Sequence, residues 1–552
     1  MAFNGFSRRD PSSSDNWTER RSGWNPLTLA LLAGVWIAAL PNWPLWHALL
    51  ALPESATPRG MLFVVGFALM LAALMTLLLA LFAWRWTIKP AIAVVLVSAA
   101  FGAHFMGSYG VVIDTTMMTN VLQTDPREVR DLLNWRLLLS VLILAGLPLL
   151  ALWRMRLSRT RWWPQAGRNL LGLVAALAVL VALVFALFAD LSATMRNHKT
   201  MRYLINPVNS FYALGDLAAQ SHAKPAGPPL PIGLDARIAP RAAGTRPPLL
   251  TLVIGETARA DHFALNGYPR PTNPELAALE VLSFRNVMSC GTNTAASLPC
   301  MFSSLGKARY ESRERDQENL LDLVQRAGMA VLWLDGQSGC KGVCDRVPRV
   351  DACADDECLD ETLLRGLDER IAALPADARA RGVLLVLHQM GSHGPAYYKR
   401  SPPDRKPFLP ECTTNVLQQC DRAALINGYD NSIAYTDHML AQTIAWLKRQ
   451  QTQYDTTLLY VSDHGESLGE NNLYLHGLPY AVAPREQTHV PMVTWLAPGT
   501  RGVSGLAIDC LRRERNKALS HDNLFHTALG VLGIRASEYV ATLDAFAPCR
   551  AP

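Results

Sequence analysis

Hydrophobic residues gather in five long segments in the first part of the chain, at residues 27–52, 61–84, 91–107, 137–153 and 170–188. A helix needs about 20 apolar residues to cross a membrane, and the third and fourth segments are the shortest of the set. Pro41 and Pro44 interrupt the first segment. We therefore predict an α-helical transmembrane domain with five spans.

Beyond residue 248 the pattern changes to short apolar runs that alternate with helical periodicity. The predicted strands are residues 249–254, 330–334, 383–387, 458–462 and 490–495, and the predicted helices include 319–327, 360–374 and 425–449. Such alternation predicts an α/β domain with a mainly parallel sheet covered on both faces. Polar chemistry is then expected at the carboxyl ends of the strands.

The remaining segments complete a multi-domain organisation. Residues 1–24 are polar and arginine-bearing, as a cytoplasmic tail would be, and residues 25–190 form the transmembrane domain, with a loop at 108–136 between the third and fourth apolar segments. Residues 191–248 contain a short bridging helix and then a linker too rich in proline for regular structure. Residues 249–552 are the predicted catalytic domain.

Basic residues indicate the orientation of the spans. The net charge is +6, but the basic residues do not form one patch, which argues against nucleic-acid binding. Arg85 and Lys89 lie between the second and third segments, and five arginines lie at 154–168 between the fourth and fifth. By the positive-inside rule the N-terminus is cytoplasmic, and five spans then place the C-terminal domain outside.

All ten cysteines lie in the second half of the chain. Their local spacing predicts five sequential disulfides, although free thiols or a zinc site are alternatives: Cys290 with Cys300, Cys340 with Cys344, Cys353 with Cys358, Cys412 with Cys420, and Cys510 with Cys549. No CxxC pair is present. Disulfides would place this half in an oxidising compartment such as a periplasm.

Two predicted strands end in potential metal ligands. One runs into Gly255-Glu256 and another into Asp463-His464-Gly465. Two carboxylates and one imidazole suit zinc, and a hydroxyl from Thr294, in the loop between Cys290 and Cys300, would complete a site with a nucleophile. The alternative is that these are ordinary strand-end turns and a stapled surface loop.

Other polar residues lie near these positions. His393 and His476 follow predicted strands and would bind a second metal or a phosphate, or protonate a leaving oxygen, unless they are merely packed. His388 lies inside a strand end and is predicted to be structural, and Lys341 is suited to a phosphate oxyanion unless it is a solvated loop lysine.

A further group lies in the loop at 108–136. Asn120, Thr124 and Glu128 are spaced four apart, on one face of a helix, which is also what an amphipathic surface helix would show. Pro126 argues against one unbroken helix through all three.

Five motifs together carry a resemblance to a known family: GETARADHFALNGYPR, SCGTNTAASLPCMFS, LHQMGSHGPAYYKR, INGYDNSIAYTD and YVSDHGESLGENNLYLHGLP. They closely resemble the lipid A phosphoethanolamine transferases, which include the mobile colistin resistance enzymes and belong to the sulfatase and alkaline phosphatase superfamily. The resemblance implies a tightly bound Zn²⁺ held by Glu256, Thr294, Asp463 and His464, with a possible second ion at His393 and His476. It also implies that Ser338 with Lys341 contacts phosphate, and that Asn120, Thr124 and Glu128 hold the lipid donor.

The implied reaction has two steps. Thr294 takes phosphoethanolamine from phosphatidylethanolamine, diacylglycerol leaves, and a lipid A phosphate then accepts the group. The added ethanolamine lowers the negative charge of the outer membrane, which would give resistance to polymyxins and other cationic peptides. The resemblance implies a multi-pass protein of the bacterial inner membrane, surrounded by membrane lipid, and we expect a monomer.

Related activities remain as alternatives. A sulfatase needs a CxPxR context, whereas Cys300 is followed by Met301 and Phe302. A membrane-anchored phosphoglycerol transferase also uses a threonine and five spans, and relatives transfer phosphoethanolamine to other periplasmic glycans. A binding module with a decayed site would lack ligands, and none is missing here.

Overall fold

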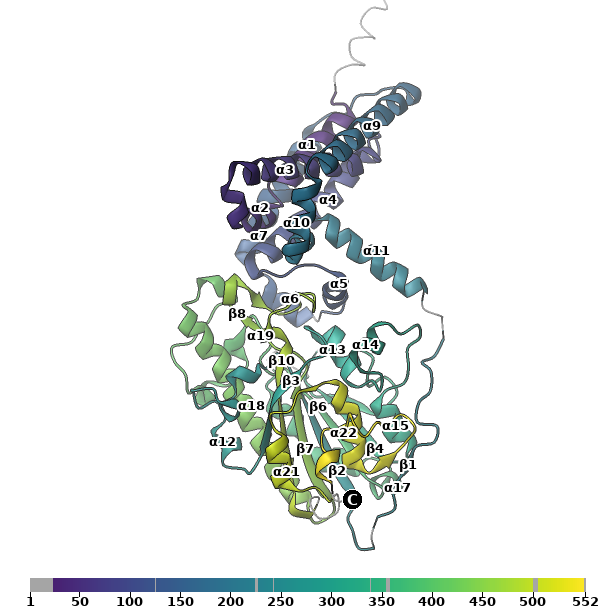
Figure 1. Ribbon diagram of the computed structural model, residues 1–552, viewed down its shortest axis with the longest axis vertical. Coiled ribbons are helices and arrows are strands. Elements are labelled where there is room, and N and C mark those ends of the chain that lie inside the picture. Colours follow the sequence, from purple (N-terminus) through teal and green to yellow (C-terminus); the bar gives the residue numbers. More distant parts are fainter. Residues whose placement is uncertain are drawn as a thin grey trace, which may run out of the picture. The chain divides into compact units, whose positions relative to one another are not determined.

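The computed structural model describes residues 23–124, 126–223, 227–241, 243–337, 339–353, 358–499 and 505–550, which fold into two compact units (Figure 1). The helical unit is bounded by Met1–Ser108 and Trp135–Tyr212. The α/β unit is bounded by Tyr109–Asn134 and Ala213–Pro552. The loop between the third and fourth apolar segments therefore belongs to the α/β unit.

Apolar helices make up the helical unit: α1 (Pro26–Ala39), α2 (Trp43–Leu50), α3 (Pro58–Ala80), α4 (Ile88–Tyr109), α7 (Trp135–Val141), α8 (Leu147–Arg154), α9 (Trp162–Ala186) and α10 (Phe188–Asn197). A π-helical stretch, Leu142–Gly146, joins α7 to α8. Among the described residues, four helices are long and apolar enough to cross a membrane, or five if the bent pair α1 and α2 is one span. These five candidates coincide with the five predicted segments.

Two of the candidate spans are irregular, namely the bent pair α1 and α2 and the span with the π-helical stretch, and prolines explain both. Helices α1 and α2 meet at a bend of 47°, and Pro44 lies in the first turn of α2, where its missing N–H costs nothing. Pro148 cannot donate the hydrogen bond that the carbonyl of Leu144 would receive in an α-helix. The indole N–H of Trp36 donates to that carbonyl instead, at 3.1 Å. The irregular backbone is thus satisfied within the helical unit, as an apolar solvent requires.

The basic loops share one end of the helical unit. The rings of Trp84 and Trp162 stack with centroids 4.1 Å apart, and Lys89 Nζ donates to the carbonyl of Met155 at 2.7 Å. Trp86 and Trp163 are strongly exposed there. Tryptophan beside arginine and lysine is typical of a membrane–water interface.

A mixed sheet forms the centre of the α/β unit. Among the described residues its eight strands are ordered β11-β3-β10-β7-β2-β6-β4-β5. Their bounds are β2 Pro248–Gly255, β3 Leu282–Met288, β4 Ala330–Asp335, β5 Arg349–Asp351, β6 Val383–His388, β7 Asp455–Ser462, β10 His489–Leu496 and β11 Leu519–Ser520. All five predicted strands are present, and β3, β5 and β11 are additional. The prediction of a mainly parallel sheet is confirmed with one exception, because β10 is antiparallel to both of its neighbours.

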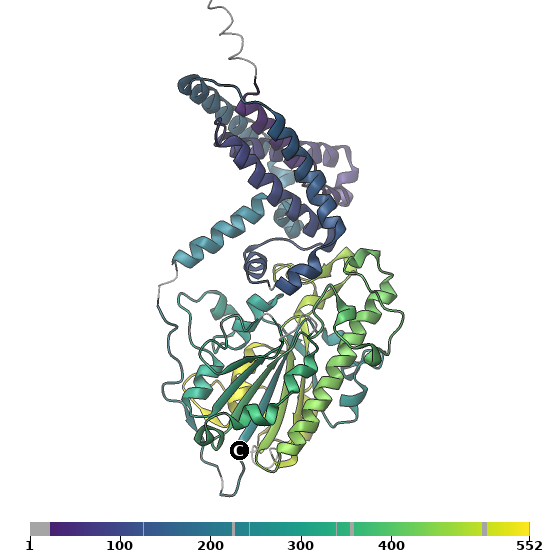
Figure 2. The same ribbon diagram turned by 180° about the vertical axis from the view of Figure 1, so that it is seen from behind.

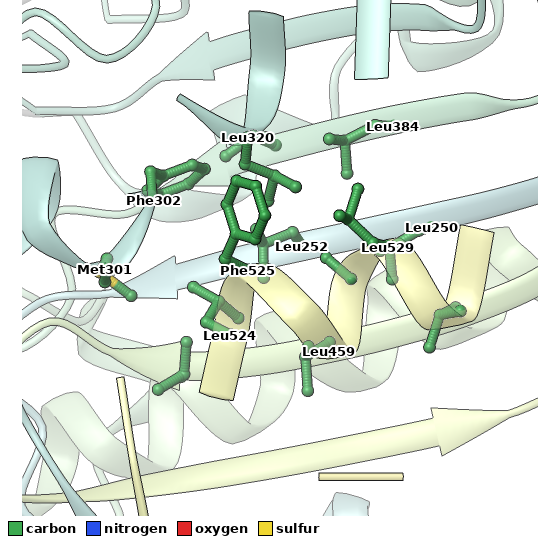
Figure 3. Packing of buried hydrophobic residues seen from close by; sticks show 14 of the residues in the cluster. Leu250, Leu252, Met301, Phe302, Leu320, Leu384, Leu459, Leu524, Phe525 and Leu529 are labelled. Atoms are coloured by element: carbon green, nitrogen blue, oxygen red, sulfur yellow. The ribbon is translucent and has the colours of Figure 1, made fainter. Parts of the chain in front are cut away.

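Helices cover both faces of this sheet (Figures 1 and 2). On one face, Leu250 and Leu252 of β2 pack with Phe525 and Leu529 of α22 (Asp522–Leu532), as Figure 3 shows. On the other face, the alternate residues of β2 pack with the long helix α18 (Arg422–Gln450). Because side chains alternate along a strand, β2 is apolar throughout and buried on both faces.

The predicted helices fit with one correction. Helix α15 (Leu320–Arg326) begins at a capping box formed by Asn319 and Asp322. The segment predicted as one helix at 360–374 is divided into a 3-10 turn, Asp360–Leu364, and α16 (Leu367–Ala372). Gly366 separates them in a left-handed conformation, with φ of 65°. A glycine adopts this geometry without the steric cost that other residues meet, and the helical periodicity did not reveal it.

The proline-rich stretch is more ordered than predicted. Strand β1 (Arg237–Ile238) pairs antiparallel with β12 (Ile534–Arg535). Ile232 is buried, and its N–H donates to Glu318 Oε2 at 3.0 Å. Contacts with distant residues fix this segment, although its own composition favours irregular structure.

Residues 109–134 form two short helices, α5 (Thr115–Leu122) and α6 (Pro126–Leu132). Pro126 starts α6, so a single helix through the segment is absent, as its position predicted. The Asp114 side chain caps α5 by accepting the N–H of Met117 at 2.8 Å. Thr115 Oγ1 donates to Asp216 Oδ2 of α11 (Val208–Ala223) at 2.7 Å.

Five disulfides join the cysteines in the predicted sequential pairs, and none of the ten is free. The Cys290–Cys300 and Cys340–Cys344 bonds close the loops that follow β3 and β4. The first segment includes most of helix α13 (Thr294–Met301), and the second is a short loop. Covalent closure restricts the unfolded conformations of both.

Packing of α22 on the sheet generates a stability prediction. Leu529→Ala removes a fully buried side chain between α22 and β2, and we expect it to destabilise the α/β unit by about 2–5 kcal/mol. The equivalent change at Leu234, which is strongly exposed, should alter stability by no more than about 0.5 kcal/mol. Thermal unfolding of the full chain in detergent measures both, and equal midpoints for the two variants would contradict the assignment of this core.

Candidate functional site

Parallel strands deliver the candidate ligands to one edge of the sheet. Gly255 at the end of β2 lies opposite Ser462 at the end of β7. The next residues, Glu256 and Asp463, therefore leave adjacent strands side by side, and the N–H of Asp463 donates to the carbonyl of Gly255 at 2.9 Å. His464 follows at once.

Three donor atoms converge there. Glu256, Asp463 and His464 each offer one donor atom within 4.8 Å of the other two, and the three side chains are fully buried. His464 Nε2 is 3.1 Å from Glu256 Oε1 and 3.5 Å from Asp463 Oδ2. Within the described residues none of these atoms has a hydrogen-bond partner. Buried polar atoms without partners are costly, so their convergence indicates a ligand.

The tautomer of His464 strengthens this conclusion. Its Nδ1 lies 2.9 Å from the carbonyl oxygen of Gly465, which can only accept a hydrogen bond, so Nδ1 carries a proton. In the neutral ring the Nε2 lone pair then faces two carboxylates. A bound cation removes that repulsion, and two carboxylate oxygens with one imidazole nitrogen fit Zn²⁺.

The electrostatics show the same excess of negative charge. Burial and the neighbouring Glu256 raise the pKa of Asp463 to about 7. Burial lowers the pKa of His464, but the carboxylates of Asp463 and Glu256 outweigh it and raise that pKa to about 10. Burial also opposes ionisation of Glu256, yet His464 holds the pKa of Glu256 well below its ordinary value. A divalent cation would supply the positive charge that the cluster otherwise takes from a proton.

Thr294 lies beside this cluster at the start of α13 (Thr294–Met301). The Asn293 side chain caps the helix by accepting the N–H of Ala296 at 2.9 Å. Thr294 Oγ1 donates to Glu256 Oε2 at 3.0 Å. The structure thus brings the predicted nucleophile to the predicted ligands, and the helix N-terminus favours an anionic group at the same place.

Gln337 is a site residue that the sequence reasoning missed. It follows β4, its Nε2 donates to Glu256 Oε2, and its own N–H donates to Asp335 Oδ1 at 2.8 Å. Because Gln337 and Thr294 both engage Oε2, Oε1 is the oxygen left for the metal. The sequence signal that could have identified Gln337 is the strand end at Asp335-Gly336. An apolar run ends there in a carboxylate and a glycine, as it does at the strand ends that supply Glu256 and Asp463.

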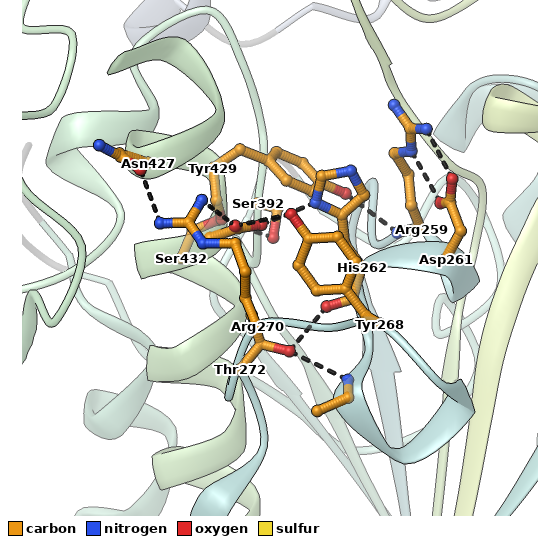
Figure 4. Close-up of polar contacts among 12 residues, drawn as sticks. Arg259, Asp261, His262, Tyr268, Arg270, Thr272, Ser392, Asn427, Tyr429 and Ser432 are labelled. Atoms are coloured by element: carbon orange, nitrogen blue, oxygen red, sulfur yellow. Dashed lines mark hydrogen bonds and ion pairs between the residues drawn. The ribbon is translucent and has the colours of Figure 1, made fainter. Parts of the chain in front are cut away.

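Helix α18 supports the turn that follows Glu256 (Figure 4). Tyr429 OH donates to the carbonyl of Thr257 at 2.7 Å and accepts the N–H of Arg259 at 3.0 Å. Thr257 is left-handed, with φ of 53°, an uncommon conformation for a β-branched residue. These two hydrogen bonds hold the turn, so Tyr429 and Arg259 support the candidate ligand Glu256.

His262 also proves to be part of this support. Buried Asp430 accepts from His262 Nδ1 at 2.7 Å, from Tyr268 OH at 2.9 Å and from Arg270 Nη1 at 2.6 Å (Figure 4). Three donors satisfy a buried carboxylate. The network fixes the GETARADH segment against α18.

The two other histidines lie close to the cluster. The rings of His393 and His476 have centroids 5.5 Å apart, and those of His464 and His476 are 4.4 Å apart. His476 Nδ1 lies 3.4 Å from Glu466, and burial raises the pKa of Glu466 to about 8. By contrast His388 is fully buried with Nδ1 3.3 Å from Asp335 Oδ2, in agreement with a structural role.

A cavity of about 550 Å³ opens onto these groups. Six of the predicted site residues line it: Asn120, Thr124, Thr294, Lys341, His393 and His476. Its described lining side chains include five lysines and arginines but one carboxylate, Asp131. Ser338 and the side chain of Glu128 lie outside the described residues. The cavity therefore suits a large anionic ligand.

Two protein families match the chain. The sulfatase family matches residues 248–534, and the family described as phosphoethanolamine transferase EptA/EptB matches residues 71–222. The first match covers most of the α/β unit, including Glu256, Thr294, Asp463 and His464, and the second covers Asn120 and Thr124.

Similar proteins match over nearly the whole chain. The phosphoethanolamine transferase EptA of Escherichia coli strain K12 is 39% identical over 549 residues, which cover 96% of this chain and 98% of that protein. The phosphatidylethanolamine transferase Mcr-1 of Escherichia coli is 38% identical over 538 residues, covering 94% and 97%. The integral membrane lipooligosaccharide phosphoethanolamine transferase A (EptA) from Neisseria meningitidis superposes with a TM-score of 0.90 at 34% identity, covering 95% of this chain and 99% of that chain.

The donor cluster generates a prediction about metal content. Asp463→Asn replaces one ligand carboxylate by a neutral amide, and we expect zinc to bind at least about tenfold more weakly. Asp544→Asn is the matched control, because Asp544 is also buried but pairs with Arg550 instead. Elemental analysis of the purified full chains measures bound zinc. Equal zinc in Asp463→Asn and wild type would show that this cluster is not the metal site.

Proposed function

Because this chain belongs to the EptA- and Mcr-1-like family of phosphoethanolamine transferases with a sulfatase domain, we propose that it transfers phosphoethanolamine from phosphatidylethanolamine to a phosphate of lipid A. One observation carries the proposal. A threonine hydroxyl, a buried three-ligand cluster and a cationic cavity meet at one place.

In the first step Thr294 attacks the phosphorus of phosphatidylethanolamine. The bond from Thr294 Oγ1 to phosphorus forms, and the bond from phosphorus to the diacylglycerol oxygen breaks. Glu256 Oε2, which accepts the hydrogen bond of Thr294, receives the hydroxyl proton. Zinc held by Glu256, Thr294, Asp463 and His464 would lower the pKa of the hydroxyl and polarise the phosphoryl group.

The leaving diacylglycerol oxygen needs a proton. His393 and His476 line the same cavity as Thr294. We assign proton donation to this pair, with a second zinc ion as an alternative use of the same side chains. Lys341 and Ser338 would hold the phosphate oxygens.

In the second step a lipid A phosphate oxygen attacks the phosphorus carried by Thr294, the bond from phosphorus to Thr294 Oγ1 breaks, and Oγ1 takes back the proton from Glu256 Oε2. The covalent intermediate lets one small site serve two bulky lipids in turn. Asn120, Thr124 and Glu128 would hold the ethanolamine-bearing lipid, and the cationic lining supports an acceptor that carries several negative charges.

The location follows from the substrates. Both lipids lie in a membrane leaflet, so apolar spans confine enzyme and substrates to one layer. The basic end of the helical unit supports a cytoplasmic N-terminus, and the five disulfides support a periplasmic catalytic domain in the bacterial inner membrane. We expect the protein to act as a monomer.

The covalent route gives a direct prediction. After exposure of the full chain to phosphatidylethanolamine vesicles, intact mass spectrometry should detect an added mass of about 123 Da. Thr294→Ala should gain none. Thr294→Ser keeps a hydroxyl nucleophile and should gain the same mass, at a different rate. A mass gain on Thr294→Ala equal to that of wild type would refute the role of Thr294.

The acceptor is tested in cells. Expression in a polymyxin-sensitive Gram-negative strain should add about 123 Da to lipid A and raise the polymyxin concentration that inhibits growth, because charge neutralisation weakens cationic peptide binding. Thr294→Ala should do neither. Unmodified lipid A, with an adduct still present on Thr294, would instead indicate another periplasmic glycan as the acceptor.

A further inference from the structure

Asp131 in α6 fastens residues 109–134 to the rest of the α/β unit. Its Oδ1 accepts from Lys399 Nζ at 2.6 Å, and its Oδ2 from Arg400 Nη2 at 3.4 Å. Its backbone carbonyl accepts from Asn415 Nδ2 at 2.7 Å. The side chain is only 13% exposed, so these charges are partly shielded from water and interact more strongly than surface pairs.

Arg400 links this anchor to the candidate site. While Nη2 contacts Asp131, Nε donates to the backbone carbonyl of His393 at 2.7 Å. His393 lines the cavity together with Thr294. One rigid, planar guanidinium therefore joins α6 to the loop that carries a site histidine.

A second contact lies at the other end of the segment. Lys341 Nζ donates to the carbonyl of Gln123, in the break between α5 and α6, at 3.2 Å. Asn120 and Thr124 lie at this end, and both line the cavity. The cavity wall that they form is thus held between Lys341 at the break and Asp131 near the end of α6.

The negative charge of Asp131 distinguishes it from the other charged residues that line the cavity. Among the described side chains that line the cavity it is the carboxylate, and five cations line the same cavity: Arg130, Lys341, Lys399, Arg400 and Lys406. Lys406 is paired with Glu411. Without Asp131, Lys399 and Arg400 would lose the carboxylate that they share, and their like charges would repel.

We propose that Asp131 is a positioning residue that holds the wall bearing Asn120 and Thr124 against the cavity, acting through Lys399 and Arg400. The proposal rests on the proposed function in one respect, namely that this wall binds the lipid donor. Its geometric part, the anchoring of α5 and α6, is independent of the reaction.

Asp131→Asn in the full chain tests both parts. With vesicles of phosphatidylethanolamine and excess lipid A, and diacylglycerol release as the measurement, the KM for phosphatidylethanolamine should rise by about tenfold, the scale of one lost hydrogen bond to a charged group. The kcat should change by no more than about twofold, because the reacting groups are untouched. Asp131→Glu keeps the charge and should recover most of the wild-type KM.

Hydrogen exchange separates positioning from a general loss of structure. Amides of α5 and α6 should exchange faster in Asp131→Asn, while those of β2 and β7 stay as protected as in wild type. Asp377→Asn is the matched control, because it breaks an exposed pair with Arg381 and should change neither exchange nor KM.

A double-mutant cycle tests whether Asp131 acts through its ion pair with Lys399. In the double variant Asp131→Asn with Lys399→Met, KM should rise by less than the product of the two single-variant increases, because both changes remove the same contact. The proposal would be overturned if the amides of α5 and α6 in Asp131→Asn exchange at the wild-type rate. It would also be overturned if the KM increase of the double variant equals the product of the two single-variant increases. If wild type releases no diacylglycerol, the proposed function fails, and hydrogen exchange alone still decides whether Asp131 anchors the segment.

Discussion

Two carboxylates and an imidazole buried side by side are the constraint on which the rest of this structure depends. Glu256, Asp463 and His464 point three donor atoms at one small volume without hydrogen-bond partners among the described residues. Burying such a group is strongly unfavourable unless a cation compensates its charge. The surrounding contacts keep it in place, since Gly465 fixes the ring of His464 and Gln337 fixes the unused oxygen of Glu256.

The sheet is what makes this concentration of charge possible. Strands β2, β3, β4, β6 and β7 run in one direction, so the residues after them, from Glu256 to Thr294, emerge at one edge. Strand β10 runs the opposite way and ends at the other edge, and it supplies no site residue. Apolar packing on both faces makes the edge rigid, which a metal site with fixed geometry requires.

Two of the segments that border the candidate site are closed by disulfides. The disulfide of Cys290 with Cys300 brackets Thr294, and that of Cys340 with Cys344 brackets Lys341. Residues 109–134 carry no cysteine and are held by ion pairs and hydrogen bonds instead.

Much of this was determined by the sequence alone. Apolar length predicted the spans, strand periodicity predicted five strands of the sheet, and local spacing predicted all five disulfides, because each depends on residues close together in the chain. The residues Glu256, Thr294, Asp463 and His464 were likewise recognisable from their positions at strand ends and in motifs. Only the tertiary structure decided the two-residue strands β1 and β11, the reversed direction of β10, and the parts played by Gln337, Tyr429 and Asp131. Those features rest on contacts between residues up to hundreds of positions apart, and no local pattern of side chains encodes which distant partner a residue will meet.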